Sequence, residues 1–307
     1  GVIQAYSETD GWSYYGASVK GPGGVYQPSP LCGALAAEYG DNVFKQVRGD
    51  DAFGAGSDLC MYAYGNVSYN KASVDRNTVY VDANYEIAED VEWFGRTMVT
   101  QNSSFGRYAP PAAPWNNMAA DNPHNPFDVE AKGYFRWVGI GTRDGVVDDY
   151  NQDYLTGLRG TISALNDAEW EVYYHHNIAD NKSIGEYYLS YSGLAYNQAN
   201  GIDLGSEAGV NNMKATTLTQ GRATFDQYNA GLGFDAFELP GGAVAHYVGM
   251  EYFDQQFSEV YDAQSEAGLI GGSAGNSAAG DRQVWAMFYE PVLPIVDGVA
   301  LNLAARY

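Results

Sequence analysis

The sequence is poor in positive charge and has no long apolar run. Of its 307 residues, 16 are Lys or Arg and 38 are Asp or Glu, which gives a net charge of −22. Nucleic acids and anionic membrane surfaces need clustered positive charge on their protein partners, so neither is expected to bind. No apolar stretch approaches the ~18 residues of a membrane-spanning helix, and the opening "GVIQAYSETDGW" lacks a signal-peptide pattern. If this protein crosses a membrane, we expect it to do so with strands.

Cysteine is almost absent. The sequence has two cysteines, Cys32 and Cys60, which flank one segment rich in Gly, Pro and Asp. In a reducing cytosol they would more often be unrelated thiols. A single pair around one loop-like segment favours a disulfide formed in an oxidising compartment.

Catalytic motifs are absent too. The sequence contains no G-x-S-x-G turn, no H-E-x-x-H helix and no phosphate-binding loop. We therefore predict neither an enzyme nor a cofactor. The strongest enzymatic rival is a secreted acidic β protein that cleaves polysaccharides, in which two carboxylates would have to converge in a cleft.

Candidate metal ligands do not form a recognisable set. Neighbouring residues of a strand point to opposite faces, so His175 and His176 cannot both reach one ion without distortion. The acidic segment "RDGVVDD" could hold calcium through Asp144, Asp148 and Asp149, but it lacks the Gly and terminal Glu of a calcium loop. We interpret it as a solvated loop, and we interpret all four histidines as interfacial or lumen residues; these are His124, His175, His176 and His246.

The sequence is instead rich in Tyr and Gly, with 26 and 37 residues, and its strand-like segments alternate in polarity. "RNTVYVDANYEI" and "VEWFGRTMVTQN" predict two strands joined by the turn "AED". One face of each strand is apolar and the other is polar. The predicted apolar face carries Val79, Val81, Tyr85, Val91, Trp93, Val244, Val248 and Met250. The predicted polar face carries Asp82, Asn84, Glu86, Glu92, Arg96 and Glu251.

Tight turns and long polar loops alternate along the chain. Tight turns such as "AED" and "ELPGG" follow some strands, whereas long segments rich in Pro, Gly, Asn or Ser follow others. About eight to ten strands of roughly ten residues or more are expected, among them 132–143 paired with 153–163. This asymmetry is typical of transmembrane β-barrels, whereas a secreted β-sandwich would have shorter strands and similar ends. The predicted fold class is all-β: part of an antiparallel transmembrane β-barrel with short periplasmic turns and long extracellular loops.

Several phrases carry a family resemblance. "FELPGGAVAHYVGMEYFDQ", "AMFYEPVLPIVDGVALNLAARY", "NPHNPF" and "WVGIGTRDGVVDDYNQDYLTGLRGTI" resemble the barrel of TonB-dependent receptors, the active transporters of the Gram-negative outer membrane. The resemblance runs from about residue 69 to residue 307 and is most specific from "LPGG" to "ARY". Neither the plug domain of that family nor its TonB-binding box is recognisable in the sequence. The chain therefore resembles the middle part of such a barrel, loop-rich with a disulfide over 1–68 and stranded over 69–307.

The resemblance implies uptake of a scarce nutrient across the outer membrane. An iron chelate, cobalamin, an oligosaccharide or a peptide would bind to the extracellular loops and pass through the lumen. The implied partners are this nutrient, outer-membrane lipid and, through the missing plug region, the TonB energy-coupling protein. Rival classes are the glycan-active enzyme and a passive porin or surface structural protein.

One loop stands out as a candidate binding site. "FGRYAPPAAPWNNMAADNPHNPF" combines rigid Pro geometry with large flat side chains and one cation, a chemistry suited to holding a ligand at low ordering cost. An equally good interpretation is a loop that packs against its own barrel mouth. The candidate residues are Phe105, Arg107, Tyr108, Trp115, His124 and Phe127.

Overall fold

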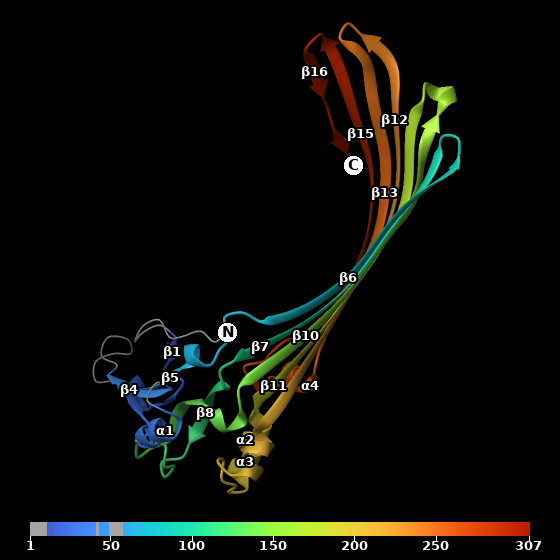
Figure 1. The fold of residues 1–307 in the computed structure, drawn as a ribbon. Coiled ribbons are helices and arrows are strands. Elements are labelled where there is room, and N and C mark those ends of the chain that lie inside the picture. Colours follow the sequence, from blue (N-terminus) through green and yellow to red (C-terminus); the bar gives the residue numbers. More distant parts are fainter. Residues whose placement is uncertain (1–10, 41–42, 49–57) are drawn as a thin grey trace.

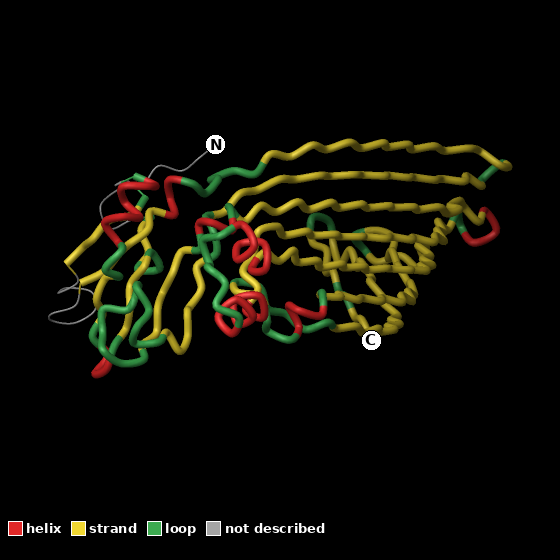
Figure 2. Tube along the Cα trace, turned by 90° about the horizontal axis from the view of Figure 1, so that it is seen from below, coloured by secondary structure: helices red, strands yellow, loops and turns green. Residues whose placement is uncertain are grey.

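The structure is a computed structural model that describes residues 11–40, 43–48 and 58–307. Its largest unit is a 10-stranded antiparallel sheet, seen as a long twisted ribbon in Figure 1 and from below in Figure 2. The main strands are β6 (Ser73–Ala88), β7 (Val91–Tyr108), β10 (Arg143–Ile162), β11 (Ala168–Ser190), β12 (Lys214–Leu239), β13 (Gly242–Tyr261), β15 (Ala278–Val296) and β16 (Val299–Asn302). They lie in the order β16-β15-β13-β12-β11-β10-β7-β6, with β14 (Ile270–Gly271) beside β11 and β17 (Ala305–Arg306) beside β15. Neighbouring main strands in the sheet are therefore consecutive main strands in the sequence, which confirms the all-β antiparallel prediction.

The connections differ at the two ends of the sheet. At one end they are the short turns 89–90, 163–167, 240–241 and 297–298. At the other end they are the long segments 109–142, 191–213 and 262–277. Figure 1 shows the short turns gathered at the end opposite the N-terminal part of the chain. The predicted alternation of tight turns and long connections is confirmed.

Strand register divides the sheet into two chemically different faces. Directly paired residues of an antiparallel ladder share a face, so the pairs Val81–Thr97 and Asp82–Arg96 place Val81 and Asp82 on opposite sides. The apolar face, as we call it, includes Val79, Val81, Tyr85, Val91, Trp93, Leu158, Val172, Val248, Met250 and Met287. The polar face includes Asp82, Asn84, Glu86, Glu92, Arg96, Asp153, His175 and Glu251. The predicted division between faces is confirmed, although Val244 is fully buried instead of exposed.

The sheet has two open edges. Among the described strands, β6 pairs only with β7, and all its residues are exposed. At the other edge, β16 and β17 have β15 as their only partner within the described part of the chain. Over the described residues no sheet closes into a barrel, so the partial-barrel prediction is confirmed only as an antiparallel all-β sheet.

Aromatic rings lie over glycines on the polar face. A Cβ atom added to Gly249 would lie 2.1 Å from the Phe288 ring, so the ring occupies the space that a side chain would fill. Similar contacts join Phe94 to Gly157 and Tyr247 to Gly231. The rings cover the sheet in place of a packed second layer, which accounts for a composition rich in both Tyr and Gly.

The long connection 109–142 folds together with the N-terminal region. Residues 11–40, 43–48, 58–67 and 109–142, here called the head, form two small sheets with the orders β1-β5-β4 and β3-β2-β9-β8. Their elements are β1 (Trp12–Ser13), β2 (Ala17–Lys20), β3 (Tyr26–Pro28), α1 (Cys32–Tyr39), β4 (Phe44–Arg48), β5 (Asp58–Ala63), β8 (Ala112–Met118) and β9 (Ala131–Arg136). The predicted strand 132–143 is wrong, because β9 ends at Arg136 and pairs with β2 and β8 in the head.

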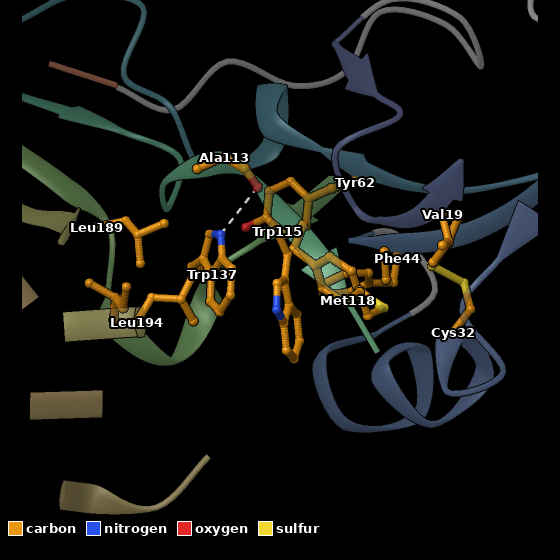
Figure 3. Packing of buried hydrophobic residues seen from close by; sticks show 14 of the residues in the cluster. Val19, Cys32, Phe44, Tyr62, Ala113, Trp115, Met118, Trp137, Leu189 and Leu194 are labelled. Carbon is orange, nitrogen blue, oxygen red and sulfur yellow. Dashed lines mark hydrogen bonds between the residues drawn. A yellow bond between two sulfur atoms is a disulfide. The ribbon is translucent and has the colours of Figure 1, made fainter. Parts of the chain in front are cut away.

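The main hydrophobic core lies in the head and not in the large sheet. Phe44, Tyr62, Trp115, Met118 and Trp137 are all buried there, as Figure 3 shows. Helix α4 (Ala263–Glu266) precedes β14. The connection between β11 and β12 adds helices α2 (Tyr191–Ala199) and α3 (Glu207–Met213). Leu194 and Met213 from these helices join the core cluster. Among the described helices, none combines the length and apolar character needed to span a membrane.

The predicted disulfide is present. Cys32 at the start of α1 bonds to Cys60 in β5, and both residues are buried. Replacing both residues with Ser should lower the stability of the head by about 3–4 kcal/mol, because the bond closes a long loop in the unfolded chain. Hydrogen exchange should accelerate at the amides of β2, β5 and β9 and stay unchanged in β12 and β13. Equal acceleration in the head and the sheet would contradict separate stabilisation of the head.

Two glycines make a matched test of the sheet. A Cβ atom at Gly160 would lie 2.0 Å from the Asp90 carbonyl oxygen, which accepts a hydrogen bond from the Thr161 N–H at 3.1 Å. Gly160→Ala should therefore lower the unfolding free energy by about 1–3 kcal/mol, since backbone cannot move aside easily. Gly249→Ala should cost less, because the Phe288 side chain can swing away through a change of χ1. Denaturant titrations of both variants measure the difference, and an equal or reversed order would refute this account.

Candidate functional site

The six candidate ligand residues fall into two separate groups. Trp115 lies in β8, while His124 and Phe127 lie in the loop between β8 and β9. Trp115 is 5% exposed, and its ring lies 5.6 Å from Phe135 and 6.1 Å from His124. These three residues belong to the head core or pack against it, which favours the packing interpretation of this half of the loop.

The other three candidate residues, Phe105, Arg107 and Tyr108, lie at the end of β7. The Arg107 guanidinium donates two hydrogen bonds of 2.7 Å to the carboxylate of Asp144, and it lies over the rings of Phe105 and Tyr69. This ion pair raises the pKa of Arg107. Tyr108 is 57% exposed, with the Arg143 guanidinium above its ring. Arg107 is therefore held by Asp144 of β10 and belongs to a different group of residues from Trp115 and His124.

A tyrosine cluster that the sequence analysis missed lies on the head. The rings of Tyr14, Tyr15, Tyr26 and Tyr134 lie 4.8 to 6.0 Å apart in tilted or edge-to-face pairs, and all four residues are partly exposed. Burial raises the pKa of Tyr15 and of Tyr134, so both remain neutral phenols. We call these four residues the tyrosine platform. The only sequence signals were the pair "YY" and the Tyr of "KGYFRW", which are distant in the chain.

A buried cation supports the platform. The Arg136 Nε atom donates to the Tyr15 carbonyl oxygen at 3.2 Å, and another guanidinium nitrogen donates to the Pro110 carbonyl oxygen at 2.9 Å. The guanidinium also lies 4.8 Å from the Tyr62 ring centroid. Burial lowers the pKa of Arg136 to about 10, which still leaves the group charged at neutral pH. Arg136 thereby fixes the backbone that presents Tyr15.

Polar side chains connect across the polar face of the sheet. The Asp153 carboxylate lies 2.7 Å from His175 Nε2 and accepts a hydrogen bond from the Asn177 amide at 3.2 Å. Arg96 approaches the same carboxylate at 3.5 Å. Nearer the short turns, a hollow of about 750 Å³ is lined by acidic residues such as Glu86 and Glu171. This face is suited to contact with water.

No set of side chains in the described part of the chain could hold a metal ion. Asp144, Asp148 and Asp149 lie in β10 instead of the expected loop, and Asp148 and Asp149 point to opposite faces. His175 and His176 likewise lie on opposite faces, and His176 Nδ1 lies 2.7 Å from the Asp226 carboxylate. His246 stacks against Phe234 and Tyr289. In the described part of the chain, these histidines contact one carboxylate each or aromatic rings and do not converge on a shared site.

Comparisons with protein-family models, with curated proteins and with solved structures found no match.

His124 makes the head sensitive to acid. Burial lowers the pKa of His124 below its ordinary value of 6.5, while Nδ1 lies 2.9 Å from the Ser29 hydroxyl oxygen. The unfolded chain therefore takes up this proton at a higher pH than the folded head. The head should lose stability as the pH falls below about 6.5, and the loss should end at the lower pKa of the folded state.

The measurement compares the wild type with His124→Gln, which cannot titrate. Hydrogen exchange of head amides, corrected for the intrinsic effect of pH, should show less protection at pH 5 than at pH 7 in the wild type. The variant should lose less protection over the same range. Identical losses in both proteins would exclude His124 as the source.

Proposed function

We propose that this chain is part of a TonB-dependent outer-membrane receptor that takes up a scarce nutrient. The observation that carries the proposal is the exposed apolar face of the large sheet. Val79, Val81 and Tyr85 on β6 are 64%, 51% and 68% exposed. On the same face near the opposite edge of the sheet, Trp285 and Met287 are 59% and 56% exposed. Continuous apolar surface of this extent is a contact surface in soluble proteins and the lipid-facing surface in membrane barrels.

An aromatic row borders the apolar face and supports its contact with lipid. Tyr174, Tyr228, Tyr252 and Trp285 are successive partners across β11, β12, β13 and β15. The ring centroids of Tyr174 and Tyr228 lie 4.9 Å apart, and those of Tyr228 and Tyr252 lie 6.3 Å apart. Amphipathic rings of this kind gather where hydrocarbon meets headgroups. We place one membrane interface at this row.

The border of the apolar face follows the aromatic row from β15 to β11 and then shifts away from the short turns toward β6. On β6 the apolar side chains begin at Val79, and the register leads from Val79 through Val99 and Gln152 to Asp281 on β15. On β15 they begin only at Trp285, which is nearer the short turns. A membrane of constant level crosses inclined strands in this slanting way, because barrel strands tilt by about 35–45°.

The open edges of the sheet support closure of the barrel by further strands. The unpaired N–H and C=O groups of β6 and β16 would be costly in hydrocarbon, where no water can satisfy them. We propose that further strands of the same polypeptide pair with both edges. The polar face, with the contacting side chains of Asp153, His175 and Asn177, then lines the lumen.

Nutrient capture is assigned to the head. In this orientation the short turns are periplasmic, and the head lies at the extracellular end of the strands (Figure 1). The family resemblance supports transport driven by the TonB protein through a plug domain. The nutrient is drawn from the classes known for that family: iron chelates, cobalamin, oligosaccharides and peptides.

Labelling from outside the cell tests this orientation. Both native cysteines are in the disulfide, so an added cysteine is the reactive one. Asp121→Cys in the head should react with a membrane-impermeant maleimide in intact Gram-negative cells. Asp297→Cys in the turn after β15 should react only after the outer membrane is permeabilised. Labelling of both positions in intact cells, or of neither, would reject the proposed placement.

A further inference from the structure

Two lysines lie within the tyrosine platform. Lys20 on β2 and Lys132 on β9 are direct partners in the strand register, and Tyr26 on β3 is the partner of Lys20 on its other side. The Nζ atom of Lys20 lies 5.6 Å from the ring centroid of Tyr26, and that of Lys132 lies 5.6 Å from the ring centroid of Tyr134. Both ammonium groups therefore lie beside the Tyr rings on one face of the head sheet β3-β2-β9-β8.

This pairing of like charges costs the fold stability. Like charges directly opposite each other on neighbouring strands repel, and cation–π contacts at exposed sites recover only part of the cost. In the described part of the chain, neither lysine lies within 4.0 Å of a carboxylate. The protein carries 38 acidic residues, so two adjacent unneutralised cations are unusual for its composition. Binding of an anion between them would remove the repulsion.

We propose that the tyrosine platform and its two lysines bind an acidic oligosaccharide. The two ammonium groups would each pair with a carboxylate or sulfate, and the Tyr rings would contact the apolar faces of the sugar rings. The partly exposed rings present apolar surface beside phenol hydroxyls, which matches the apolar faces and hydroxyl groups of a sugar. This inference rests on the proposed function, since it names the nutrient class that the head captures.

The charge of the whole protein sharpens the selectivity. A net charge of −22 repels polyanions at long range, so a polyanion needs local cations in order to bind, whereas a neutral sugar does not. Binding should therefore weaken on removal of the lysines and on removal of the ligand's negative charges. The binding affinity should also depend on the salt concentration, because these charges are exposed to solvent.

Calorimetry on the purified full-length protein tests the inference. The probes are oligogalacturonate, oligomannuronate and a sulfated oligogalactan, each compared with its methyl-esterified or unsulfated form. At least one acidic probe should bind more tightly than its neutral form. The double variant Lys20→Gln with Lys132→Gln should weaken that binding roughly tenfold or more, as expected for loss of charged hydrogen bonds.

A matched control removes the same charge elsewhere. Lys71→Gln with Lys182→Gln changes two exposed lysines outside the platform and should leave binding within about twofold, because solvent and salt screen distant charges. The inference is overturned when no acidic probe binds better than its neutral form, or when both double variants weaken binding equally. Failure of the proposed function shows separately, as maleimide labelling on the wrong side of the membrane, and leaves the calorimetry unaffected.

Discussion

The two-residue period of a strand governs the organisation of this protein. Each long strand presents apolar side chains to one side and polar side chains to the other, and the register keeps these sides aligned from β6 to β15. A shift of one residue in any ladder would place carboxylates among the apolar side chains. The apolar face, the polar hollow near the turns and the position of the head all depend on this alignment.

The two parts of the molecule are stabilised differently. The head is stabilised by a buried core and a disulfide. The large sheet relies on ladder hydrogen bonds and on rings such as Phe288 that cover glycines. In our proposal lipid supplies the missing partner for its other face. Arg107 and Asp144 join β7 to β10 next to the head, where these two kinds of stabilisation meet.

Local patterns in the sequence predicted much of the large sheet. Alternation identified the strands around Val79 and Met250, and tight-turn residues identified the connections. Prediction failed where distant segments meet. Residues 132–136 alternate like a barrel strand but pair with β2, because the head places them together. The tyrosine platform combines three such segments, and Trp115 is buried by contacts that no local pattern contains.

The central claim is that the apolar face of the sheet contacts lipid, and one pair of variants tests it directly. Val81 and Asn84 both lie exposed on β6 but on opposite faces. Folding titrations of the full polypeptide into lipid vesicles should show that Val81→Arg costs about 1–3 kcal/mol, because the cost of an arginine on the lipid face rises with its depth in the bilayer. Asn84→Arg should change the folding free energy by less than about 0.5 kcal/mol, as a substitution on a wetted surface does. Equal effects of the two substitutions would contradict the account.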